Sequence, residues 1–163
     1  MMNPRSQASE HSEPIVFPPV IPVSGLLLGI LLEFLWPSTT WLPGSARLGL
    51  RSLGGLVFLV GAAGFAWMVA TMKRAGTPIH NAETPTALVE SGPYRLTRNP
   101  MYLFGSIAYA GLALLLLTLW CLVLLPFVVA ATHYGVIRRE EVFLERHFGE
   151  AYTRYQARVR RWW

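Results

Sequence analysis

The side chains best suited to chemistry lie in two short polar stretches, separated by a long apolar segment. Residues 91–102 carry two tyrosines, two arginines and an asparagine. Residues 133–141 carry one histidine, two arginines and two adjacent glutamates. These residue types can recognise charged groups, donate and accept hydrogen bonds, and transfer protons. We therefore take the place where the two stretches meet as the candidate site.

The first stretch is expected to turn instead of continuing a helix. Pro93 and Pro100 each fix φ and disfavour helical backbone at the residue before them. Beside a membrane span, irregular backbone is tolerated where it is buried in protein or lines a wet cavity. This stretch is therefore expected to be ordered.

The second stretch leaves two interpretations open. Adjacent residues on a helix point about 100° apart, so Glu140 and Glu141 could do different work, one facing the site and the other pairing with an arginine. Alternatively, 138–145 is a solvated, salt-bridged start of a helix. His133 is either a packed hydrogen-bonding residue or a functional group.

Composition indicates a membrane protein. Of the 163 residues, 53% are hydrophobic and 14% are charged, whereas soluble domains carry about 25% charged residues. Four basic residues fall in 73–98 and seven in 138–161, so these two regions hold eleven of the 14. Such clusters are typical of the positive-inside bias and of contact with anionic headgroups, and we predict no nucleic-acid partner.

Common catalytic and metal-binding signatures are missing from the chain. It has no glycine-rich nucleotide motif, no H-E-x-x-H and no C-x-x-C. The histidines have no recognised metal-ligand spacing, so we predict no metal. The single cysteine, Cys121, excludes a disulfide within the chain.

The hydropathy pattern predicts an all-α fold, an integral membrane helical bundle of about four transmembrane helices. The expected spans are 15–36, 52–72, 101–118 and 120–137, and the last two form a C-terminal helical hairpin. Residues 1–14 are expected to be a disordered polar tail, and 15–163 a single domain. Residues 138–163 are expected to form an amphipathic helix in the headgroup plane, broken near Gly149.

Small residues in the second expected span indicate close helix packing, whereas the glycines of the first span either allow such packing or face lipid. Gly25 and Gly29 form a G-x-x-x-G pair, and 52–72 is rich in glycine and alanine. The basic regions place the 73–98 connection, both termini and the site on the cytoplasmic side. We predict a multi-pass protein of the bacterial inner membrane, with its site built from 76–102 and 133–155.

Two ordered motifs carry a resemblance to a known family. Gly92-Pro93-Tyr94-Arg95 with Arg98-Asn99-Pro100-Met101-Tyr102 resembles the G-x-Y…R-[HN]-P-x-Y motif of the isoprenylcysteine carboxyl methyltransferases, which are related to the phospholipid N-methyltransferases. Glu140-Glu141…Phe148-Gly149-Glu150-x-Tyr152-x-x-Tyr155 is similar to their C-terminal block. The resemblance runs from about residue 76 to residue 161.

The resemblance implies an integral membrane enzyme that uses S-adenosyl-L-methionine and methylates a lipophilic, membrane-associated acceptor. It implies a cofactor site made of Thr86, Ala87, Leu88, Val89, Tyr94, Asn99, Pro100, Met101, Tyr102 and Glu140, and we add Arg98 and Glu141 to this candidate site. Because the match assigns Glu140 to the cofactor, Glu141, which points about 100° away on a helix, is expected to pair with an arginine. Eukaryotic members usually have a histidine at the position of Asn99, and an arginine four residues before the first glutamate, where this chain has Val136. The acceptor-orienting role could pass to Arg138 or Arg139, and His133 is the nearest base for an amine or thiol.

The acceptor is left open between an isoprenylcysteine-type carboxylate, a phospholipid amine, and a small apolar thiol or acid. Two other functions are also considered. One is a membrane reductase that uses a nicotinamide cofactor, since sterol reductases have a similar C-terminal architecture. The other is a non-catalytic membrane scaffold.

Overall fold

The structure, a computed structural model, describes residues 19–77 and 87–162. The predicted tail, the start of the first expected span and the 78–86 segment lie outside the described residues. The described elements are helices: α1 Val20–Leu35, α2 Gly44–Arg74, η2 Gly92–Arg95, α3 Pro100–Leu115, α4 Leu119–Thr132, η3 His133–Ile137, α5 Arg138–Phe148 and α6 Glu150–Arg158. The all-α prediction is confirmed for the described part of the chain.

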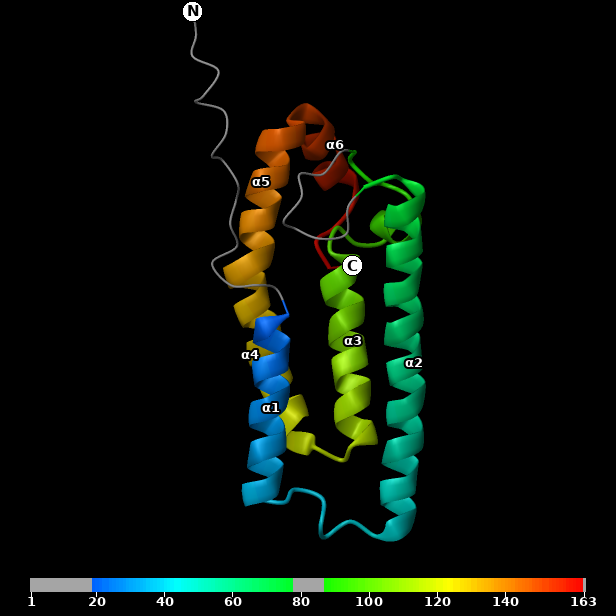
Figure 1. The fold of residues 1–163 in the computed structure, drawn as a ribbon, viewed down its shortest axis with the longest axis vertical. Coiled ribbons are helices and arrows are strands. Elements are labelled where there is room, and N and C mark those ends of the chain that lie inside the picture. The colour runs from blue at the N-terminus through cyan, green and yellow to red at the C-terminus, as the bar shows by residue number, and fades with distance from the viewer. Residues whose placement is uncertain (1–18, 78–86, 163) are drawn as a thin grey trace, which may run out of the picture.

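Four long helical segments run side by side along the molecule (Figure 1). The helix α1 packs on α4, α4 packs on α3, and α3 packs on α2. The helices α4 and α5 make one continuous rod through a short π-helical segment, η3. The end of α2, the start of α3 and the C-terminal segment all lie at the same end of the bundle as α5.

Glycines bring the helices close together. A Cβ added at Gly29 of α1 would lie 2.4 Å from the sulfur of Cys121 on α4. One at Gly61 of α2 would lie 2.4 Å from the backbone nitrogen of Ala108 on α3. The close packing predicted for the second span is confirmed, and of the two alternatives for Gly25 and Gly29 the structure shows close packing against α4.

Two described helices are long and apolar enough to cross a membrane by length and composition, Gly44–Arg74 and the continuous Leu119–Phe148. The helices α1 and α3 have 16 residues each, about 24 Å at 1.5 Å per residue, and are shorter than the roughly 30 Å hydrocarbon core. The count of four spans therefore stays a prediction. Large apolar side chains such as Leu27, Leu56 and Phe127 are exposed along α1, α2 and α4, as expected of a lipid-facing surface.

The hairpin between the last two spans turns slightly earlier than predicted. Its turn covers 116–118, because Leu117 adopts a positive φ of 59° and Thr118 donates its backbone N–H to the Ala113 carbonyl at 2.8 Å. The helix α2 begins eight residues before the predicted start at 52 and ends two residues after the predicted end at 72. Gly76 has φ 65°, and Thr77 N–H donates to the Met72 carbonyl at 3.2 Å, which closes the last turn.

The first part of the amphipathic segment expected over 138–163 is not a separate helix, as the prediction implied, but the end of a longer one. Residues 138–148 continue α4 as α5, and the chain turns at Gly149, where φ is 54° and ψ −128°, before α6 begins. The break near Gly149 is confirmed. In α6, Tyr152 and Tyr155 are buried in the protein.

Candidate active site

Three segments distant in sequence meet at one end of the bundle. The first is the 97–99 turn before α3, the second is α5, and the third is the extended segment 159–162 after α6. Pro100 occupies the first turn of α3, where its missing N–H costs nothing, and the helix therefore starts immediately after Asn99. The expected meeting of the two polar stretches is observed.

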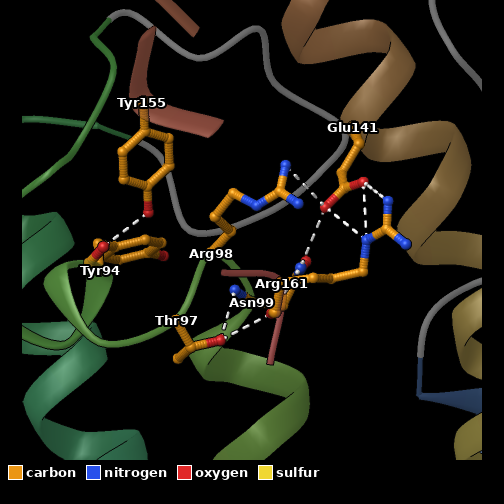
Figure 2. Close-up of polar contacts among 7 residues, drawn as sticks. All are labelled: Tyr94, Thr97, Arg98, Asn99, Glu141, Tyr155 and Arg161. Atoms are coloured by element: carbon orange, nitrogen blue, oxygen red, sulfur yellow. Dashed lines mark hydrogen bonds and ion pairs between the residues drawn. The ribbon is translucent and has the colours of Figure 1, made fainter. Parts of the chain in front are cut away.

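Glu141 is the centre of the polar contacts (Figure 2). Its carboxylate accepts hydrogen bonds from Arg161 Nε at 3.0 Å to each oxygen and from Arg161 Nη2 at 2.6 Å. Arg98 Nη1 lies 3.5 Å away on the other side, and Asn99 Nδ2 also lies 3.5 Å away. The Glu141 side chain is only 7% exposed, so these partners compensate a buried charge. The prediction that Glu141 pairs with arginine is confirmed.

Glu140 has a different environment from its neighbour. It is half-buried and accepts a hydrogen bond from the Tyr102 hydroxyl at 3.0 Å. Among the described residues, no arginine forms an ion pair with it. Of the two adjacent glutamates, Glu140 is therefore the one whose carboxylate is left for an external cation.

Arg98 is the converse case, a buried cation with a hydrogen-bond donor left unpaired among the described residues. Its side chain is 11% exposed, and its buried Nε–H has no hydrogen-bond partner among the described residues. An unpaired buried donor is costly unless a ligand or water satisfies it. The site thus presents a cationic donor at Arg98 and a carboxylate at Glu140.

The C-terminal segment is tied to the turn before α3 by backbone contacts. Arg98 N–H donates to the Arg160 carbonyl at 3.0 Å. The Arg161 carbonyl accepts from the Thr97 hydroxyl at 2.8 Å and from Asn99 Nδ2 at 3.3 Å. These bonds hold the Arg161 backbone beside Arg98, the other arginine that contacts Glu141.

Tyrosines line the side of the site next to α6. The Tyr155 hydroxyl donates to the Tyr94 carbonyl at 2.7 Å, joining α6 to η2 (Figure 2). Burial raises the pKa of Tyr94 and Tyr155 above the ordinary value, and the Glu140 carboxylate adds to the rise at Tyr94. Burial, followed by the Glu141 charge, raises the pKa of Tyr152 to about 12. All three phenols are therefore neutral at physiological pH.

The three residues predicted to be catalytic lie outside the hydrogen-bond network around Glu141. The His133 ring lies 6.1 Å from the Trp162 ring, centroid to centroid, and its buried Nδ1 has no partner among the described residues. Arg138 is exposed, with its guanidinium 5.8 Å from the centre of the Tyr134 ring. Arg139 is exposed. Their roles stay predictions.

The rest of the predicted cofactor stretch is only partly described. Thr86 lies outside the described residues. Ala87 is exposed, and its carbonyl accepts from the Thr77 hydroxyl at 3.4 Å. Leu88, Val89 and Met101 are half-buried, and Pro100 is buried.

Sequence reasoning missed Arg161. The arginines of 158–161 fall in the segment that the sequence predicts to lie in the headgroup plane, so none of them is predicted to belong to the site. Trp163 lies outside the described residues, whereas Trp162 packs against His133. The one sequence feature that could have pointed to Arg161 is Glu141, because a buried glutamate needs a positively charged partner and that partner can come from another segment.

The fold and the site together describe a helical membrane protein with a polar site at one end. A family model, described as phospholipid methyltransferase, matches residues 50–151. The chain belongs to this family of membrane methyltransferases. Comparisons with curated proteins and with solved structures each give no match. The matched region includes most of α2, for which no family motif was identified from the sequence, and ends just before Tyr152.

Proposed function

We propose that this protein is an S-adenosyl-L-methionine-dependent methyltransferase that acts on a lipophilic, membrane-associated acceptor. The observation that carries the proposal is the unequal state of the two adjacent glutamates. Glu141 is neutralised by arginines, whereas Glu140 has only a tyrosine hydroxyl as its observed partner. The family match supports methyl transfer as the reaction class.

The residues present fit the chemistry of the cofactor. Its ammonium group requires a carboxylate, which Glu140 supplies. Its carboxylate requires a cationic donor, and Arg98 has a buried Nε–H without a partner among the described residues. Its sulfonium is a cation that aromatic faces attract, and Tyr94 and Tyr102 are the nearest predicted contacts.

When bound, the cofactor supplies an electrophilic methyl group. The protein's own contribution is then alignment of the acceptor and exclusion of water, because the positive charge of the cofactor is cancelled by an anionic acceptor or passed to a neutral one and no new charge develops. A carboxylate acceptor needs no base. An amine or thiol acceptor must lose a proton, and His133 Nδ1 is the group we assign to accept it.

The proposal includes the orientation of the protein in the membrane and the class of acceptor. We place the site, both termini and the 73–98 connection on the cytoplasmic face of a bacterial inner membrane, because the basic residues gather there. The acceptor classes are an isoprenylcysteine-type carboxylate and a phospholipid amine. Arg138 and Arg139 are exposed beside the site and would orient an anionic acceptor.

The test uses purified protein in detergent or vesicles, S-adenosylmethionine with a labelled methyl group, and lipid extract. Mass spectrometry should find the label in a lipid product with wild-type protein and not with Glu140→Gln. Base-labile label indicates a carboxyl ester, and base-stable label on a headgroup indicates an amine. Label in no lipid, together with no binding of S-adenosylhomocysteine, would refute the proposal and favour a scaffold. Binding of NADPH instead would favour a reductase.

A further inference from the structure

Arg161 and Arg98 share one buried carboxylate unequally. Arg161 makes the close contacts to Glu141, at 3.0, 3.0 and 2.6 Å, through two nitrogens. Arg98 makes one longer contact at 3.5 Å. A two-nitrogen contact to a carboxylate is the strong arrangement for a guanidinium. Arg161 is therefore the principal counter-ion of Glu141.

The charges of this cluster do not cancel. Two guanidiniums face the single carboxylate of Glu141, which leaves one positive charge over. Arg98 is the more buried of the two arginines, with a side chain 11% exposed against 36% for Arg161. Its Nε–H has no partner among the described residues. The positive charge that Glu141 does not balance is therefore accompanied by an unpaired N–H donor on Arg98.

We propose that Arg161 is a positioning residue that keeps Arg98 available to an anionic group of the ligand. It does so by occupying the Glu141 carboxylate. Without the Arg161 side chain, Glu141 would be left to Arg98, and a two-nitrogen contact between them would cancel the charge. This inference rests on the proposed function, because the anionic group is the carboxylate of the cofactor.

The Arg161 backbone is held independently of its side chain. Its carbonyl accepts from Thr97 and Asn99, and the preceding carbonyl accepts from the Arg98 N–H. A substitution of the side chain therefore removes the guanidinium and keeps the backbone bonds of the C-terminal segment. This separates a charge effect from a loss of structure.

The experiment is calorimetric titration of S-adenosylhomocysteine into four proteins in detergent. Arg161→Gln should bind about tenfold more weakly than wild type, since Arg98 then pairs with Glu141. The double variant Arg161→Gln with Glu141→Gln should recover to within about threefold of wild type, because Arg98 again has no competing carboxylate. Arg158→Gln is the matched control. Arg158 is an exposed arginine of the same C-terminal region, paired with Glu90 at 2.7 Å, and its loss should change nothing.

Two further measurements keep the outcome clear. Arg161→Lys retains a counter-ion for Glu141 and should bind within about threefold of wild type even if the double variant does not fold. Decarboxylated S-adenosylhomocysteine should bind wild type and Arg161→Gln equally, because it lacks the group that Arg98 recognises. Equal binding of S-adenosylhomocysteine by wild type and Arg161→Gln, or no recovery in a folded double variant, would overturn this inference alone. Failure of wild type to bind S-adenosylhomocysteine would overturn the proposed function and this inference with it.

Discussion

The two ends of the bundle are stabilised in different ways. In the apolar half, helix backbones approach each other through glycines, as where Gly111 of α3 faces Phe58 of α2. At the polar end, three segments are joined by hydrogen bonds and ion pairs centred on Glu141. The difference indicates that the bundle supplies a rigid frame, while the polar end holds groups whose charges depend on one another. The two ends should therefore respond differently to substitution.

The largest effect on stability is expected at Glu141. Glu141→Gln leaves two arginines without their carboxylate, and breaking a buried ion pair from one side costs about 3–5 kcal/mol. Thermal unfolding in detergent, followed by circular dichroism, should show a large drop in the midpoint. Glu90→Gln, which removes an exposed partner of Arg158, is the control and should cost at most about 1 kcal/mol. Equal midpoints for the two variants would show that the Glu141 cluster is not a stabilising centre.

The next largest effect on stability is expected in the apolar half of the bundle, at Gly61. Gly61→Ala places a methyl group 2.4 Å from the Ala108 backbone nitrogen, so α2 and α3 must move apart, at a cost of about 1–3 kcal/mol. Gly55→Ala on the same helix is the matched control, because its Cβ would have only the Leu115 Cδ1 atom within reach, at 3.9 Å. The alanine at residue 55 should be neutral or slightly stabilising. If both variants unfold alike, glycine-mediated packing does not hold this pair of helices.

Bundle packing and the site differ in how far the sequence could predict them. The small residues of the second span predicted close packing, because small side chains act locally on one helix face, whereas the G-x-x-x-G pair left packing and lipid exposure open. The two motifs assigned Tyr102 and Glu140 to one site, and in the structure the Tyr102 hydroxyl lies 3.0 Å from the Glu140 carboxylate. Arg161 could not be assigned, since its partner lies 20 residues away in sequence and the choice among several arginines depends on the turn at Gly149. The continuous α4–α5 rod was missed because 138–148 has a polar composition.

A smaller effect is expected where α6 meets η2. Tyr155→Phe removes the hydrogen bond to the Tyr94 carbonyl, at a cost of about 1 kcal/mol. Tyr134→Phe, at an exposed ring on η3, is the control and should leave the unfolding midpoint unchanged. A midpoint for Tyr155→Phe equal to that of the control would mean that this bond does not hold α6 in place.

The buried phenols also predict a pH dependence. Burial raises the pKa of Tyr152 from 10.0 to about 12, so the folded state holds this proton more tightly than the unfolded state. The stability it contributes is full below pH 10 and is lost as the pH rises from 10 towards 12. Tyr152→Phe should make the fall in unfolding midpoint over this range shallower. An unchanged slope would exclude Tyr152 as a source of the alkaline loss.

The central claim is that the two adjacent glutamates have separate roles, Glu140 towards the cofactor and Glu141 towards the arginines. Calorimetric titration of S-adenosylmethionine into Glu140→Gln and Glu141→Gln, at a temperature where both are folded, tests it most directly. Loss of a charge-assisted contact costs about 1.5–3 kcal/mol, so Glu140→Gln should bind roughly ten- to a hundredfold more weakly than wild type. Glu141→Gln should bind within about threefold of wild type despite its lower stability. The reverse order of affinities would contradict the account and make Glu141 the ligand of the cofactor.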